Sequence, residues 1–225
     1  MDQLGLDREK RSLVIIKKLR KATVDMIEPA VTSIVKDFGQ NPFLVLVSCI
    51  LSLRTKDTVS LPTSRKLFLF AKTPQGVLDL SLEKIEEIIY PVGFYRNKAR
   101  HLHEISRDLI GRFGGFVPDN EKDLLSLKGV GRKTANLVLG EGFGIPAICV
   151  DTHVHRISNR LGLVNTKTPK DTEVELKNIL PKKYWIEYNR LLVQWGQNVC
   201  MPVSPFCSKC KIYDLCSRVG IKNSR

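Results

Sequence analysis

Residues 127–135 read Leu-Lys-Gly-Val-Gly-Arg-Lys-Thr-Ala, and this stretch decides how the rest of the chain is interpreted. Two glycines, Gly129 and Gly131, separate two runs with helical patterns. Glycine tolerates a positive φ and lets another backbone approach closely. The stretch therefore predicts a helix-hairpin-helix whose turn amides and second helix N-terminus form an anion site. The alternative is an ordinary surface turn followed by a solvated lysine, because Gly-x-Gly turns are common.

The composition predicts a folded chain with an acidic partner. The 225 residues suffice for one large or two small domains, and a hydrophobic fraction of 43% supports a real core. The formal net charge of +13 favours nucleic acid over the alternative of a merely soluble basic chain. The longest apolar run, residues 43–53, is too short and too interrupted for a membrane span. The N-terminus also lacks the pattern of a secretory signal.

Helical periodicity accounts for most of the chain, and no period-two alternation of useful length is present. The sequence therefore predicts an all-α protein. The first 22 residues predict an amphipathic helix with a basic face that packs on the protein rather than on a membrane. Residues 43–53 are apolar nearly all round, which predicts a helix buried on every side. Further helices are expected over 27–38, 64–71, 82–90, 99–113, 123–127, 132–139, 152–161 and 189–199.

Three polar residues stand at expected helix starts. Asn41 precedes a proline, and Ser81 precedes an isoleucine-rich run, so each is expected to be an N-cap. Asp151 precedes an apolar periodic run, and capping that helix is its simplest role, with a value of about 1 kcal/mol.

A second, degenerate hairpin is predicted at residues 93–99. Gly93, Arg96 and Ala99 repeat the spacing found within 129–135, with Phe94 and Tyr95 at the tip. An aromatic residue at such a tip is suited to wedge between bases. The alternative is that both aromatic rings pack in the core.

Four cysteines lie close together near the C-terminus with the spacing Cys-x6-Cys-x2-Cys-x5-Cys: Cys200, Cys207, Cys210 and Cys216. Four thiolates in a compact segment predict a tetrahedral zinc site or an iron–sulfur cluster, and spacing alone leaves the metal open. Two prolines prevent a helix in the first loop. The clustering is not typical of a disulfide framework and indicates a reducing compartment. Cys49 and Cys149 lie in apolar runs and are expected to be inert core thiols.

Together these motifs resemble the endonuclease III family. The resemblance rests on residues 127–135, on Val150-Asp151-Thr152-His153 with Arg156 and Asn159-Arg160, and on the cysteine loop, in that order. It implies an all-helical fold of two domains with an active site between them. A six-helix domain carrying the hairpin is expected at 36–145, and a discontinuous domain at 1–35 and 146–225. The second domain is expected to hold a 4Fe-4S cluster, which selects iron–sulfur over zinc.

The resemblance implies a DNA glycosylase with AP lyase activity in base excision repair, acting on oxidised pyrimidines. Lys133 is then the nucleophile and Asp151 the essential carboxylate. The amine attacks only when neutral, and a helix's first turn disfavours an ammonium ion. The carboxylate stabilises positive charge on the sugar and accepts a proton. A Schiff base forms, and β-elimination cuts the strand 3′ to the lesion.

The expected DNA contacts include several departures from the family. This chain has Lys128 at the position where family members have Pro. It has Arg54 where bacterial members have the Gln that fills the gap left by a flipped base. It has Phe94 where they have the Leu that acts as a wedge. A lysine nucleophile also differs from the Ser and Tyr of the adenine- and thymine-mismatch relatives. The expected DNA-binding residues are Arg54, Phe94, Lys128, Gly129, Val130, Gly131 and Arg132.

We expect a monomer that acts on double-stranded DNA with a damaged base or abasic site, in the cytoplasm and associated with the nucleoid. Two alternatives remain open at this stage. One is a glycosylase of the same superfamily with another lesion or mismatch specificity. The other is a non-catalytic DNA-binding hairpin protein.

Overall fold

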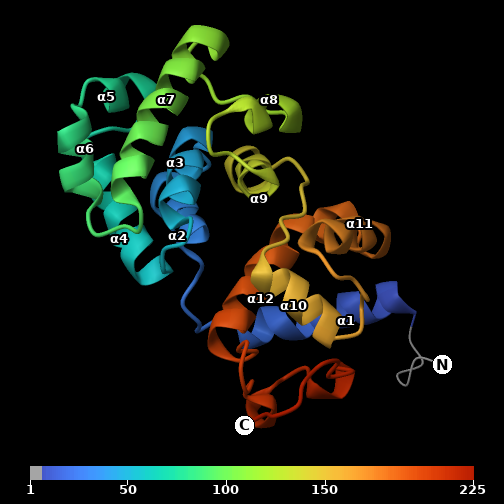
Figure 1. Cartoon of the computed structure of the whole chain (residues 1–225). Coiled ribbons are helices and arrows are strands. Elements are labelled where there is room, and N and C mark those ends of the chain that lie inside the picture. Colours follow the sequence, from blue (N-terminus) through green and yellow to red (C-terminus); the bar gives the residue numbers. More distant parts are fainter. Residues whose placement is uncertain (1–6) are drawn as a thin grey trace. The chain divides into compact units, whose positions relative to one another are not determined.

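The computed structural model describes residues 7–225, and every regular element in this part of the chain is helical (Figure 1). This confirms the all-α prediction. The chain divides into two compact units, Pro29–Ile145 and the described residues up to Glu28 with Pro146–Arg225. The division falls before the helix α2 (Ala30–Phe38), whereas the sequence placed it at residue 36, inside that helix. Over residues 7–225, no helix is both long and apolar enough to cross a bilayer.

The unit Pro29–Ile145 is built around helix α3 (Pro42–Ser52), whose residues 43–51 are all buried. Burial on every side follows from the uniformly apolar sequence, as predicted. Asn41 caps α3 by accepting hydrogen bonds from the amides of Phe43 and Leu44, each at 3.1 Å. Around it pack α2, α4 (Asp57–Phe68), α7 (Tyr95–Phe113), α9 (Arg132–Leu137) and the π-helical turn η1 (Val138–Gly142). The unit is completed by α5 (Pro74–Leu78), α6 (Leu82–Ile89) and α8 (Glu121–Ser126).

Several predicted bounds in this unit are wrong. Helix α2 begins after Pro29 rather than at Ile27, and the Ile27 side chain is 78% exposed. Helix α4 begins seven residues before the predicted Ser64, because it accommodates Pro62 in its interior. The second hairpin helix changes to π-helical geometry at Val138, which no sequence signal indicated. The N-cap at Ser81 is confirmed, since its Oγ accepts from the Lys84 amide at 3.1 Å.

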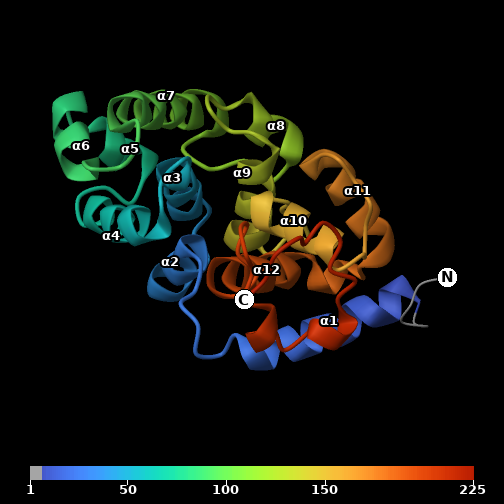
Figure 2. The same ribbon diagram turned by 60° about the horizontal axis from the view of Figure 1, so that its bottom comes forward.

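The other unit centres on α12 (Trp185–Asn198), which packs against both α1 (Arg8–Ala22) and α10 (Thr152–Arg160) (Figure 2). Its core joins Ile15, Ile16 and Leu19 of α1 to Tyr188 and Trp195 of α12. Helix α11 (Pro169–Ile179), which the sequence analysis missed, contacts α1 and α10. Short 3-10 turns complete the unit: η2 (Lys182–Tyr184), η3 (Cys207–Lys209) and η4 (Tyr213–Leu215).

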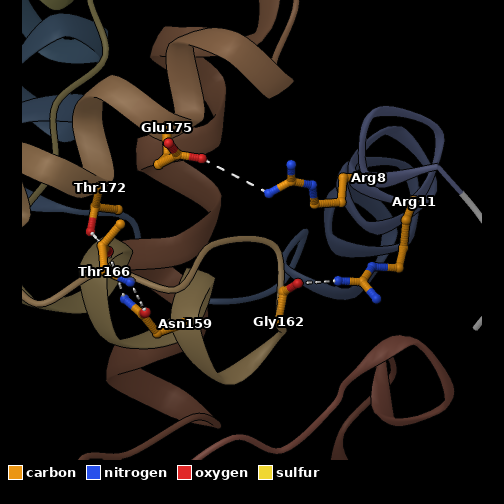
Figure 3. Close-up of polar contacts among 7 residues, drawn as sticks. All are labelled: Arg8, Arg11, Asn159, Gly162, Thr166, Thr172 and Glu175. Atoms are coloured by element: carbon orange, nitrogen blue, oxygen red, sulfur yellow. Dashed lines mark hydrogen bonds and ion pairs between the residues drawn. The ribbon is translucent and has the colours of Figure 1, made fainter. Parts of the chain in front are cut away.

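Two arginines of α1 bind residues of the segment that follows residue 146 (Figure 3). The buried Arg11 guanidinium donates to the carbonyls of Leu161 at 3.0 Å and Gly162 at 2.6 Å. Arg8 forms an ion pair with Glu175 of α11 at 3.9 Å. The predicted packing of this helix on the protein is thus confirmed for residues 8–22, and residues 1–6 lie outside the described part.

Threonines tie α10 to α11 in the same view (Figure 3). The hydroxyls of Thr166 and Thr172 are 2.5 Å apart, and the Thr166 amide donates to Asn159 Oδ1 at 2.9 Å. This network anchors the C-terminal part of α10, the helix whose N-cap is Asp151.

Candidate active site and DNA interface

Helices α8 and α9 form the predicted hairpin, joined by residues 127–131, which we call the hairpin turn. Gly129 has a φ of +74°, so its glycine is required by backbone conformation, as expected. A Cβ there would also lie 3.0 Å from Nδ1 of His101 on α7. Gly131 is different: its φ is −101°, and an added Cβ would meet no protein atom within 4 Å. Nothing in the described chain therefore requires glycine at position 131.

Only part of the hairpin turn presents its backbone outward. The Val130 amide donates to the Leu127 carbonyl at 3.1 Å, and the Val130 side chain is buried. This amide is therefore already used within the turn, and its binding to phosphate stays a prediction. The amides of Gly129 and Gly131 donate to no other residue within 7–225. The predicted anion site narrows to these two amides and the start of α9.

Lys133 is the second residue of α9 and is exposed. Its amine lies close enough to the buried Cys49 of α3 to affect that thiol: burial raises the pKa of Cys49 to about 12, and the Lys133 charge opposes this shift. Cys49 is thus buried, as expected of a core thiol. Arg132, expected to contact DNA, forms an ion pair with Glu121 of α8 at 2.8 Å, whereas Lys128 is exposed.

Asp151 is the N-cap of α10 in the other unit. Its Oδ1 accepts hydrogen bonds from the amides of His153 and Val154, each at 2.9 Å, so the predicted N-cap is confirmed. The buried segment before it is held by Asn189 of α12, whose amide donates to the Cys149 carbonyl at 2.9 Å. The carboxylate is half-buried. Its position is therefore fixed by the helix that it caps and by the core.

Arg54 and Phe94, predicted independently, lie together. Arg54 follows the end of α3, Phe94 is the N-cap of α7, and the Arg54 guanidinium carbon is 5.8 Å from the centre of the Phe94 ring. The Phe94 side chain is 61% exposed, so the alternative that it packs in the core is wrong. Both residues have left-handed backbones, with φ of 52° at Arg54 and 60° at Phe94.

The segment from residue 90 to residue 94, which we call the second turn, is not an exact repeat of the hairpin turn. The left-handed residue is Phe94, one position later than Gly129 in the repeat, and Gly93 has no positive φ. Gly93 is glycine for another reason, because a Cβ would lie 3.0 Å from the Arg54 carbonyl oxygen. The close approach of the second turn to residue 54 thus depends on Gly93.

Lys98 is a residue that sequence reasoning missed. It lies on α7 and is buried, with its Nζ donating to the carbonyls of Leu51 at 2.8 Å and Leu53 at 2.5 Å. A third bond goes to Oγ1 of Thr55 at 3.1 Å. Burial lowers the pKa of Lys98 from 10.5 to about 8. In sequence, it was indistinguishable from its exposed polar neighbours Arg96 and Asn97.

The four C-terminal cysteines lie on the loop that follows α12. None forms a disulfide, and all four are partly buried. The segment between Cys200 and Cys207 is not helical, as its prolines predicted. Burial raises the pKa of Cys210, and of Cys216 to about 11, and the charges of the other loop cysteines add to both shifts. The four sulfurs are therefore electrostatic neighbours.

Arginines of α10 hold this loop. Arg160 Nη1 donates to Sγ of Cys200 at 3.3 Å and to the Met201 carbonyl at 2.7 Å. Arg156 Nη2 donates to the Cys200 carbonyl at 2.9 Å and lies 3.1 Å from Nδ1 of His153. Four uncrosslinked thiols fit a four-thiolate group, while no set of three or more His, Cys, Asp or Glu in residues 7–225 is arranged around one ion.

Known proteins share this arrangement of motifs. Residues 47–182 match the family model described as HhH-GPD superfamily base excision DNA repair protein. Over 85% of this chain and 92% of the relative, the sequence is 47% identical to endonuclease III of Thermotoga maritima. The chain belongs to the endonuclease III family. It is accordingly a base excision DNA repair protein of the HhH-GPD superfamily.

Solved structures of the endonuclease III family agree. A non-covalent endonuclease III–DNA complex matches with a TM-score of 0.82 and 33% identity, covering 95% of this chain and 96% of that one. A trapped endonuclease III–DNA covalent intermediate matches with a TM-score of 0.81 and 33% identity, covering 95% and 97%. The two-domain helical fold implied by the sequence is therefore the fold of the family. Members of this family generally carry a 4Fe-4S cluster.

Proposed function

We propose that the chain is a bifunctional DNA glycosylase and AP lyase that removes oxidised pyrimidines from double-stranded DNA. The observation that carries the proposal is the exposed Lys133 in the first turn of α9, directly after a hairpin turn with two available glycine amides. A phosphate held by those amides places the adjacent sugar near the lysine amine. A relative of known structure, endonuclease III, has been trapped in a covalent intermediate with DNA. An exposed lysine amine at this place is suited to be the nucleophile that forms such a bond.

The chemistry assigns one role to each residue. Neutral Lys133 attacks C1′ of the damaged nucleotide, and the bond from C1′ to the base breaks as the base leaves with the bonding electrons. Asp151 stabilises the positive charge on the sugar and accepts a proton from the attacking amine. The sugar ring then opens: the C1′–O4′ bond breaks, O4′ takes a proton, and C1′ becomes the carbon of a Schiff base with Lys133. The Schiff base acidifies C2′, loss of the C2′ proton eliminates the 3′ phosphate, and hydrolysis frees the lysine.

DNA binding is divided between backbone and side chains. The amides of Gly129 and Gly131 hold a phosphate without reading sequence. Arg54 and Phe94 fill the space that the flipped nucleotide leaves and unstack its neighbours. With a net charge of +13, binding depends strongly on salt. The substitution of Arg54 for the Gln of bacterial relatives supports a second candidate, namely a related glycosylase with a shifted lesion range. A panel of duplexes with different lesions and opposite bases distinguishes the two.

The four loop cysteines are proposed to hold the 4Fe-4S cluster of the family. In a cubane each thiolate binds a separate iron, so the four sulfurs need not converge on one ion. When bound, the cluster supplies a structural cross-link among Cys200, Cys207, Cys210 and Cys216. Free thiols at these positions also support a reducing compartment. Purified protein is expected to contain about four iron and four sulfide per chain, and one zinc without iron contradicts the assignment.

Borohydride trapping measures the proposed chemistry. Borohydride reduces a Schiff base to a stable protein–DNA adduct, so the wild type is expected to give an adduct with duplex DNA that carries an oxidised pyrimidine. Lys133→Gln is expected to give none, while Lys122→Gln, which removes an exposed lysine of α8, keeps it. Trapping by Lys133→Gln would place the nucleophile elsewhere.

The role of Asp151 is separable from its cap. Asparagine caps helices as well as aspartate does, so Asp151→Asn keeps the hydrogen bonds to the amides of His153 and Val154. We expect base release to slow by roughly 100-fold or more, the usual contribution of a positioned acid or base, with DNA affinity nearly unchanged. Equal losses of affinity and base release favour a cap-only role.

A further inference from the structure

Two strained residues stand side by side at the surface of the unit Pro29–Ile145. Arg54 and Phe94 both have left-handed backbones, a conformation that disfavours residues with a Cβ. Strained residues of this kind persist where their surroundings over-determine them. The two residues belong to segments far apart in sequence, and the cation–π contact between their exposed side chains is too weak to fix both backbones. Another group must therefore hold the two segments together.

That group is buried directly beneath them. Lys98 lies one helical turn after Phe94, and its amide donates to the Phe94 carbonyl at 3.0 Å. Its Nζ binds the carbonyls of Leu51 and Leu53, the last residues before Arg54. An ammonium ion has three N–H donors, and here all three have a partner. Bonds to a charged donor are also stronger than those between neutral groups.

Thr55 completes the connection from the other side. Its Oγ1 accepts from Lys98 Nζ at 3.1 Å and from the Gly93 amide at 3.2 Å. One hydroxyl thus joins the residue after Arg54 to the residue before Phe94. Gly93 allows the close approach, because a Cβ at that position would lie 3.0 Å from the Arg54 carbonyl oxygen. Lys98 and Thr55 therefore act on the backbones on both sides of the two strained residues.

We propose that Lys98 is a positioning residue that, with Thr55, locks the end of α3 to the second turn and so holds Arg54 and Phe94 as one two-residue wedge. This inference rests on the proposed function, in which those two side chains enter the DNA duplex. Lys98 itself is buried and touches no DNA in this account. Its effect is specific to duplex substrate, because a single strand has no opposing base and no gap to fill.

The first experiment compares Lys98→Met with the wild type. Methionine keeps the length of the side chain and removes every donor. We expect single-turnover incision at an abasic site in duplex DNA to fall roughly tenfold or more, the size expected from losing hydrogen bonds to a charged group. Incision of the same site in a single strand should be unchanged. Arg107→Met, which removes an exposed cation from the same helix, serves as the control and should change neither rate.

Fluorescence reports the wedge directly. With 2-aminopurine placed beside the abasic site, wedge insertion unstacks the probe, so saturating wild type and Arg107→Met should raise its fluorescence in the duplex. Lys98→Met should fail to do so. Thr55→Val, a milder change that keeps the side-chain shape, should weaken the signal, and Thr55→Ser, which keeps the hydroxyl, should restore it. The valine and serine variants keep the question answerable if Lys98→Met does not fold.

The outcomes separate this inference from the proposed function. If wild type forms no borohydride-trapped complex, the proposed function fails. If wild type is trapped but Lys98→Met keeps full duplex incision and the full fluorescence rise, the positioning role is wrong. Equal losses on duplex and single strand, or equal behaviour of the Thr55 valine and serine variants, also overturn it, since Lys98 is then only a structural residue.

Discussion

The hairpin turn and the second turn both join two helices, and both lead into a helix with basic residues in its first turns. They differ in which residue takes the left-handed backbone. In the hairpin turn it is Gly129, for which a positive φ costs little, and the turn presents backbone amides. In the second turn it is Phe94, whose backbone is strained by the positive φ and whose ring is exposed. Glycine thus suits a turn that binds by backbone, and a bulky residue suits one that binds by side chain.

The supports beneath the two turns differ accordingly. The hairpin turn is held by the bond from the Val130 amide to the Leu127 carbonyl, by the buried Val130 side chain, and by the partly exposed ion pair between Arg132 and Glu121. The second turn rests on the buried charge of Lys98 and on the Thr55 hydroxyl. The turn with the strained, exposed side chain is thus bonded to a buried charge, whereas the ion pair across the hairpin is partly exposed.

The largest expected change concerns the buried charge under the second turn. Because burial lowers the pKa of Lys98 from 10.5 to about 8, the unfolded chain binds more protons than the folded protein between these pH values. The free energy of unfolding of wild type relative to Lys98→Met should therefore rise by about 3 kcal/mol from pH 8 to pH 10.5, at about 1.4 kcal/mol per pKa unit. Urea unfolding of both proteins measures this difference. If the difference in free energy of unfolding between the two proteins does not change with pH, the Lys98 amine is solvated and its pKa is not lowered.

Gly129→Ala tests the hairpin turn, with Gly114→Ala as its control. Both glycines have a positive φ, +74° and +62°, but an added Cβ would lie 3.0 Å from His101 at Gly129 and no nearer than 4.0 Å to Phe116 at Gly114. Each variant should lose about 1–2 kcal/mol of stability because alanine disfavours a positive φ. Only Gly129→Ala should also weaken DNA binding, by roughly tenfold or about 1.4 kcal/mol, as measured by fluorescence anisotropy. Equal affinities for the two variants argue against a phosphate at this turn.

Phe94→Gly should improve stability and impair function. Glycine relieves the left-handed strain, so the free energy of unfolding should rise by about 1 kcal/mol, reduced by any loss of contact of the exposed ring. Base release from duplex DNA should fall roughly tenfold because the wedge is gone. Phe116→Gly removes another exposed ring and should leave base release unchanged. If Phe94→Gly keeps full activity on duplex DNA, the second turn does not act through its exposed side chain, and the proposed difference between the two turns is wrong.

The smallest expected effect is at Gly131. Its φ is ordinary and its surroundings are open, so Gly131→Ala should change stability by less than about 0.5 kcal/mol. If a phosphate approaches this backbone, the added methyl group should still weaken DNA binding by roughly threefold, equally for duplexes of different sequence, since phosphate contacts carry no sequence information. Unchanged affinity in a titration at low salt indicates that Gly129 alone presents the phosphate site.

Much of the fold could be predicted because its signals are local. The caps at Asn41, Ser81 and Asp151 follow from short polar side chains beside apolar periodic runs, and the structure has all three. The α3 helix is buried as its composition indicates. The start of α4 was misplaced because Pro62 reads as a boundary, whereas the packed helix tolerates it.

The site was predicted less evenly, for a physical reason. Arg54 was found through the resemblance and Phe94 first through the repeated spacing of 93–99, and the structure shows their side chains in contact. Lys98 was missed because its partners, the carbonyls of Leu51 and Leu53, lie more than forty residues earlier in the chain. Backbone carbonyls are the same at every position, so no sequence pattern marks them as acceptors. The engaged amide of Val130 was missed for the same reason, since turn hydrogen bonds depend on conformation.

The central claim is that Lys133 forms the covalent bond to DNA, and peptide mapping of the borohydride-trapped complex tests it most directly. The wild-type protein is trapped on duplex DNA that carries an oxidised pyrimidine, the DNA and protein are digested, and the remaining sugar adduct is located by mass spectrometry. We predict the adduct on the side-chain amine of Lys133, within the peptide that follows Gly131. An adduct on another lysine or on the N-terminal amine contradicts the account.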